Sequence, residues 1–270
     1  MERNVKKNVK EFSFDNAKRI MTKDLRQLRA NKEIFITMII LPLLMGVLMP
    51  LLMGVMAFVD PESLAAEGLD PYIAFRDLII NGTLKPMFLM IPGVISMMVA
   101  ADSFAGEKER KTIEALLVLP VSHREIYVGK MLTALIPSVF FSITCFFIMG
   151  VEINLMTNQL IPPGEPIFIF SDPAFWMLAF LTGPLLSVVN IQAGLMISSR
   201  SKDVKSASTV SGFLILPLLG LIFATIANPM ILSSELIVLV ISGVLIGVVY
   251  GLTILGAKVI NREKLVANID

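Results

Sequence analysis

The sequence is poor in the residue types that carry most metal and nucleophile chemistry. Its 270 residues include one histidine, His123, and one cysteine, Cys145. Zinc catalysis usually needs clustered His and Cys ligands, and these two residues lie 22 positions apart, so a zinc-dependent peptidase is excluded. A lone cysteine also excludes a disulfide within the chain. We therefore expect neither a catalytic residue nor a metal site.

A phosphate-binding loop is also missing. Such an ATP site needs the pattern G-x-x-x-x-G-K-[ST], in which backbone amides and a lysine hold the phosphates. The sequence contains no such pattern, so this chain does not bind ATP in that way. We expect it to bind no cofactor and no nucleic acid.

Charged residues are scarce as well. They make up 17% of the chain, against about a quarter in a soluble domain, which indicates a membrane protein. Crossing the bilayer takes about 20 mostly apolar residues, and the apolar runs here are continuous, unlike the alternating strands of a membrane barrel. The expected fold is an all-α membrane protein. Its six transmembrane helices, within residues 34–258, cover about 34–59, 86–104, 128–151, 174–199, 207–229 and 236–257.

The basic residues are distributed very unevenly between the two sides of these spans. Of the 23 Lys and Arg residues, 21 fall on the side of the two tails, 1–33 and 259–270, and only Arg76 and Lys85 fall on the other. Because basic loops stay in the cytoplasm, we predict a multi-pass plasma-membrane protein with both termini cytoplasmic. The outer loop over 60–85 is acidic, and we interpret this as the counterpart of that bias, in preference to a cation funnel. Its sequon at Asn81 is a candidate glycan site.

The N-terminal tail carries a helical pattern before the first span. Apolar residues on one helical face recur at spacings of three and four, and most basic residues lie elsewhere around the helix. The stripe consists of Phe14, Ala17, Met21, Leu25 and Leu28. The pattern favours an amphipathic helix at the inner membrane interface, with its basic side toward anionic headgroups or a protein partner. The alternative is a solvated juxtamembrane helix.

Polar residues within the spans are few. Asn190 and Gln192 are costly when they face lipid, so they are candidates for a translocation path. A hydrogen bond between helices is the alternative for both. Gly243, Gly247 and Gly251 repeat every fourth residue and predict a strip for close helix packing.

The segment between the second and third spans is a charged block, "GEKERKTIEALLVLPVSHREIYVGK". It begins with good helix formers, and Ile113 and Leu116 lie on an apolar face, which predicts an amphipathic helix over 107–119. Pro120 ends that helix. Ser122 and Glu125 then form the capping box S-x-x-E, which starts the helix of the third span. The pattern therefore predicts a short helix, a sharp corner and a new membrane helix.

This block resembles the inner-loop signature of ABC type-2 permeases, the membrane subunits of ATP-driven transporters. An acidic-basic run, a threonine, a glutamate, a leucine pair, a proline corner and a Gly-Lys pair agree with that signature, whereas Lys111 stands where glycine is usual. The matching residues are Glu107, Glu109, Thr112, Glu114, Leu116, Leu117, Pro120, Ser122, Gly129 and Lys130. The basic N-terminal helix and the six spans are also similar to that family.

The resemblance implies a permease that pairs with a second copy or with a related subunit, and with two cytoplasmic ATPase subunits. The first inner loop, with its coupling segment at 105–122, would fit a cleft on the ATPase, beside the interfacial helix. ATP and Mg would belong to that partner. Family resemblance favours export. The cargo stays open between a hydrophobic or amphiphilic molecule and an ion.

The rival interpretation is a carrier or scaffold that needs no ATPase. Ion-coupled carriers usually place acids in mid-span, whereas Asp102 and Glu152 both fall at span ends. An ATPase that co-purifies with the chain would separate the two interpretations.

Overall fold

The computed structural model describes residues 12–53, 73, 75–114, 121–157 and 169–259. No strand occurs in these ranges, and six helical segments are long and apolar enough to cross a membrane. They are Lys32–Met53, Phe75–Glu109, His123–Met156, Pro173–Arg200, Val204–Ala227 and Glu235–Gly256. The predicted all-α fold with six spans is confirmed. Leu116, Leu117 and Pro120 lie outside the described residues.

The helices follow one another in a simple order along the chain. The first half contains α1 (Phe14–Ala30), α2 (Lys32–Leu43), η1 (Leu44–Leu48), η2 (Phe75–Leu84), α6 (Lys85–Glu109) and α8 (His123–Thr157). The second half contains α9 (Pro173–Met177), η3 (Leu178–Thr182), α10 (Gly183–Arg200), α11 (Val204–Gly212), η4 (Phe213–Ile215), α12 (Leu216–Ala227), α13 (Met230–Ser233) and α14 (Glu235–Val259).

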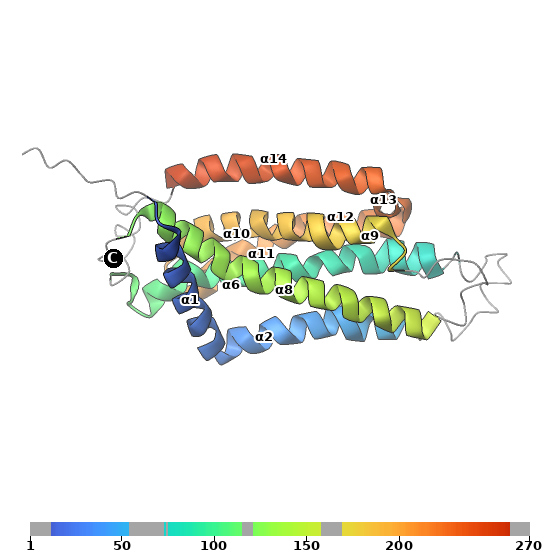
Figure 1. Ribbon diagram of the computed structural model, residues 1–270, viewed down its shortest axis with the longest axis horizontal. Coiled ribbons are helices and arrows are strands. Elements are labelled where there is room, and N and C mark those ends of the chain that lie inside the picture. The colour runs from blue at the N-terminus through green and yellow to red at the C-terminus, as the bar shows by residue number, and fades with distance from the viewer. Residues whose placement is uncertain (1–11, 54–72, 74, 115–120, 158–168, 260–270) are drawn as a thin grey trace, which may run out of the picture.

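The spans form one bundle around α6. Most side chains of α6 are buried, and it packs against α10, α8 and α11. α1 does not run with the spans: it lies crosswise at the end of the bundle where α6 ends and α8 begins (Figure 1). α9, α13 and the start of α6 lie at the opposite end. We call the end with α1 the inner end and the other the outer end, following the predicted orientation.

The helix of the second span is longer than predicted, and the loop expected over 60–85 is partly wrong. Helix begins at Phe75, as the π-helix η2, and runs on into α6. Phe75, Ile80 and Leu84 are buried because η2 packs against α12 and α13. Asn81 is only 4% exposed and its amide donates to Asp77 Oδ1. The candidate glycan site is therefore closed to modification in this fold.

The glycine strip of the sixth span does not pack within the described part of the chain. A Cβ added at Gly243, Gly247 or Gly251 would meet no atom within 4 Å. α14 is instead attached to the fourth span by side-chain hydrogen bonds, of which Thr182 with Ser242 at 2.9 Å is one. The predicted close helix contact through this strip is wrong for the single chain.

Candidate functional site

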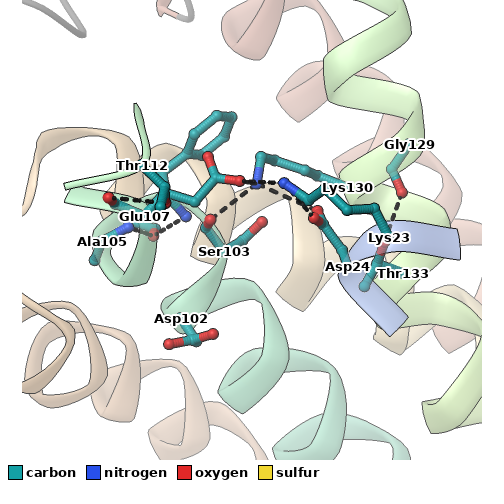
Figure 2. A network of polar contacts seen from close by, with 12 residues as sticks. Lys23, Asp24, Asp102, Ser103, Ala105, Glu107, Thr112, Gly129, Lys130 and Thr133 are labelled. Carbon is teal, nitrogen blue, oxygen red and sulfur yellow. Dashed lines mark hydrogen bonds and ion pairs between the residues drawn. The ribbon is translucent and has the colours of Figure 1, made fainter. Parts of the chain in front are cut away.

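A network of polar contacts lies at the inner end, around the buried side chain of Lys130 on α8 (Figure 2). Its Nζ donates to the carbonyl of Ser103 at 2.9 Å and lies 4.7 Å from the centre of the Phe104 ring. It also forms ion pairs with Asp24 Oδ2 at 3.4 Å and Glu107 Oε1 at 3.2 Å. One ammonium group therefore joins α1, α6 and α8.

A second lysine completes this arrangement. Lys23 Nζ lies 3.0 Å from Asp24 Oδ1 and 3.1 Å from Glu107 Oε1, and its side chain is about half exposed. Burial lowers the pKa of Lys23, but the charges of Asp24 and Glu107 outweigh it and leave the pKa above its usual value. We call Lys23, Asp24, Glu107 and Lys130 the inner cluster. Its two cations balance its two carboxylates, as a buried group of charges requires.

Glu125 fixes the starts of two helices together. Its backbone N–H donates to Ser122 Oγ at 3.2 Å and its carboxylate accepts from the backbone N–H of Ser122, so the predicted capping box is confirmed. The same carboxylate accepts from Ser13 N at 2.8 Å and Asn16 Nδ2 at 3.0 Å, at the start of α1. A single buried side chain therefore caps both α8 and α1.

Gly129, next to Lys130, lets α1 approach α8 closely. A Cβ at this position would lie 2.9 Å from the carbonyl oxygen of Ala17 and 2.9 Å from Ile20 Cβ. Real side chains do not tolerate such contacts, because a backbone carbonyl moves only with its helix. The Gly-Lys pair therefore serves one contact, in which glycine permits the approach and lysine makes the ion pairs.

The helix predicted over 107–119 is interrupted. α6 ends at Glu109, and Lys111 has φ 57°, in the left-handed region. Thr112 N donates to Glu107 O at 2.8 Å and Lys111 N donates to Lys108 O at 3.0 Å, the hydrogen-bond pattern of a Schellman motif. Glu107 therefore belongs to the helix of the second span, and the chain turns where the signature usually has glycine.

The conformation of Lys111 leads to a prediction about stability. A left-handed residue other than glycine costs about 1–2 kcal/mol, and a β-branched side chain there is a clear outlier. We expect the Lys111→Val variant to be less stable than Lys111→Gly by about 1–2 kcal/mol, measured by denaturant unfolding in detergent micelles. At the exposed helical position Lys18, Lys18→Val should instead be more stable than Lys18→Gly, since glycine disfavours helix. If the valine variant were the less stable one at both positions, the left-handed conformation of Lys111 would be contradicted.

The other residues predicted to couple to the ATPase occupy distinct environments. Glu109 is exposed and its carboxylate accepts from Val204 N at 3.2 Å, at the start of α11. Thr112 and Glu114 are exposed, and Ser122 is used in the capping box. The accessible part of the coupling segment, as far as it is described, is therefore the turn over 109–114, apart from the buried Ile113.

A second set of contacts ties this segment to the connection between the fourth and fifth spans. Lys108 Nζ donates to the carbonyls of Ser199 at 2.8 Å and Ser201 at 2.9 Å. Ser198 Oγ of α10 accepts from the backbone N–H groups of Phe104 and Ala105 near the end of α6. The end of α6 is thus held by α1, α8 and α10 together.

The predicted apolar stripe of α1 is divided between two environments. The buried face consists of Ala17, Ile20, Asp24 and Leu28, and α1 packs against α8. Phe14 is 58% exposed, and Met21 and Leu25 lie between these extremes. Of the predicted stripe, Ala17 and Leu28 pack within the protein, and Phe14, Met21 and Leu25 remain accessible for contact with lipid.

The two amides in the fourth span are buried in helix contacts. Asn190 Nδ2 donates to the carbonyl of Gly93 on α6 at 3.2 Å, and Gln192 Nε2 donates to Thr253 Oγ1 on α14 at 2.8 Å. They point to different neighbours, α6 and α14. Both amides therefore form hydrogen bonds between helices, which is the alternative predicted for them.

Comparison with known proteins identifies relatives of this chain. A family profile described as "ABC-2 family transporter protein" matches residues 19–237, a range that contains the whole inner cluster. The chain is also 30% identical over 167 residues to the protein named "ABC transporter permease protein NatB" of Bacillus subtilis strain 168. That match covers 59% of this chain and 42% of the relative, so this chain spans less than half of that protein's length.

Proposed function

This chain belongs to the ABC-2 family of transporter proteins, and on that premise we propose that it is the membrane subunit of an ATP-driven exporter. ATP hydrolysis would take place in a separate cytoplasmic ATPase, which holds ATP and Mg. A second permease copy would complete the transporter. The cargo would be a hydrophobic or amphiphilic molecule or an ion.

The inner cluster is the observation that carries this proposal. The turn over 109–114, which is exposed except for Ile113, begins two residues after Glu107. Glu107 lies in ion pairs with Lys23 of α1 and Lys130 of α8. Displacement of the turn therefore acts on α1 and α8 through charged contacts that are already formed. A partner that contacts the turn differently in two nucleotide states would shift the spans between two arrangements.

The first test is whether an ATPase accompanies the chain. The protein would be purified in mild detergent and everything that stays bound, protein and small molecule, identified by mass spectrometry. We expect an ATP-binding subunit in a constant ratio to the chain. A chain that purifies without an ATPase and still moves cargo would favour the ATPase-independent carrier.

Charge reversal on the turn leads to a second test. Glu114 is exposed, so Glu114→Lys leaves the internal packing unchanged but places the wrong charge on the surface offered to the ATPase. We expect the ATPase activity of the complex in vesicles, measured as phosphate release, to fall about tenfold or more, because like-charge contacts at an interface cost several kcal/mol. The midpoint of thermal unfolding should not change.

A matched control lies at the other end of the bundle. Glu235 is an exposed acid at the start of α14, so Glu235→Lys makes the same charge change away from the turn. Its complex should keep the ATPase activity of the unmodified protein. Equal activity in both variants would rule out the turn as the coupling surface.

A further inference from the structure

A second fully buried lysine, Lys85, lies at the outer end, at the junction of η2 and α6. Its side chain is 0% exposed, its Nζ forms an ion pair with Asp172 Oδ2, and it donates to the carbonyl of Leu232 at 3.1 Å. Asp172 precedes α9, and Leu232 lies in α13, between the fifth and sixth spans. One ammonium group therefore holds together three segments that are far apart in sequence.

Asp172 uses its two oxygens for different tasks. Oδ1 accepts from the backbone N–H groups of Ala174 at 3.0 Å and Phe175 at 3.3 Å and so caps α9, which continues into the fourth span. Oδ2 is the partner of Lys85. The position of the outer end of the fourth span thus depends on the ammonium of Lys85 as well as on the cap.

This contact is suited to reversible opening. A buried ion pair stabilises a fold no more than apolar residues of the same size do. Stability alone therefore does not account for a lysine at this position. When an ion pair separates, water hydrates both charges, whereas opening an apolar contact exposes surface that water does not stabilise. Asp172 is already 22% exposed, so water reaches one partner before the pair opens.

α6 connects this contact to the inner cluster. The helix is continuous from Lys85 to Glu109 and carries Glu107 of the inner cluster at its other end. Displacement of the inner end of α6 therefore reaches Lys85 through a single helix.

We propose that Lys85, Asp172 and the Leu232 carbonyl form the outer closure of the permease, which is shut at rest and opens to water when nucleotide acts at the inner end. This proposal rests on the proposed function. Lys85 is a positioning residue in it: it holds α9 and α13 against the start of α6 and does not contact cargo.

The test measures water access to the closure. Ala174 is small and 0% exposed beside Asp172, so Ala174→Cys, in a Cys145→Ser background, is a buried reporter for a membrane-impermeant maleimide. In vesicles that contain the complex with its co-purified ATPase, ATP with vanadate should raise the labelling rate about tenfold. An unchanged rate in a complex that hydrolyses ATP would overturn the closure. A chain with no associated ATPase would instead overturn the proposed function.

A charge-neutral variant tests the ion pair itself. Asp172→Asn keeps the ability to cap a helix but removes the charge, and it should raise labelling of the reporter about tenfold without nucleotide. Asp203→Asn, the same change at the cap of α11, should leave labelling unchanged. An unchanged labelling rate in Asp172→Asn would overturn the proposal. So would labelling of a cysteine at the buried position Ala134 of α8, as Ala134→Cys, at the same rate as Ala174→Cys, because the whole fold would then have opened.

Discussion

Lys130→Met is expected to destabilise the protein by about 3–5 kcal/mol, the range found when one partner of a buried ion pair is removed. Methionine has a similar length, so the substitution removes the charge and leaves the packing largely unchanged. Asp24 and Glu107 would then share only Lys23, whose side chain is about half exposed. Denaturant unfolding in detergent micelles measures the loss. The ATPase activity of the complex should also fall, since α8 loses its charged contact with Glu107 of α6.

A second substitution separates charge imbalance from lost packing. In Lys130→Met combined with Asp24→Asn, one cation and one carboxylate remain in the inner cluster, so the double variant should be more stable than Lys130→Met alone. Lys205→Met, at an exposed position of α11, should change the free energy of unfolding by no more than about 0.5 kcal/mol. Additive losses in the double variant would show that the four charges do not act as one cluster.

Features that depend on neighbouring residues were predictable from the sequence. The six spans follow from continuous apolar runs, and the start of α8 follows from Ser122 and Glu125, three positions apart. Each depends on hydropathy or on a hydrogen bond within one turn of helix.

Features that depend on distant contacts were not predictable. The sequence predicts a loop at 75–84, where the structure has a helix, because Arg76 and Asp77 interrupt the apolar residues. Those two side chains pair with each other at 3.0 Å and stay exposed, while the buried side packs against α12 and α13. The surface of α12 and α13 that buries this side of η2 forms only in the folded protein.

The sequence identifies only part of the inner cluster. Lys130 belongs to the family signature, whereas Asp24 lies in a helix rich in basic residues and matches no motif. Asp24 lies four positions from both Ile20 and Leu28, which are buried on the same face of α1. A lone acid on an apolar helical face predicts a buried cation nearby, because an unpaired carboxylate there would be too costly. Which lysine forms the ion pair with Asp24 depends on the fold.

Gly129→Ala is expected to separate α1 from the bundle, although it adds one methyl group. In a helix this change usually stabilises by about 1 kcal/mol, and at Gly220 in α12, where a Cβ meets no atom within 4 Å, we expect that gain. At Gly129 the methyl would meet the Ala17 carbonyl at 2.9 Å, so the expected change has the opposite sign, a loss of about 1–3 kcal/mol. Denaturant unfolding of both variants in micelles provides the comparison.

The sign of the Gly129→Ala effect decides how α1 works. The Ile20 side chain can rotate away from the new methyl, but the Ala17 carbonyl belongs to the backbone, so relief requires α1 to move. That movement would draw Lys23 and Asp24 away from Glu107 and Lys130, and Asn16 away from Glu125. We therefore expect the ATPase activity of the complex to fall with stability in Gly129→Ala and to stay unchanged in Gly220→Ala. A Gly129→Ala complex that lost stability but kept full activity would show that α1 supports the fold without taking part in coupling.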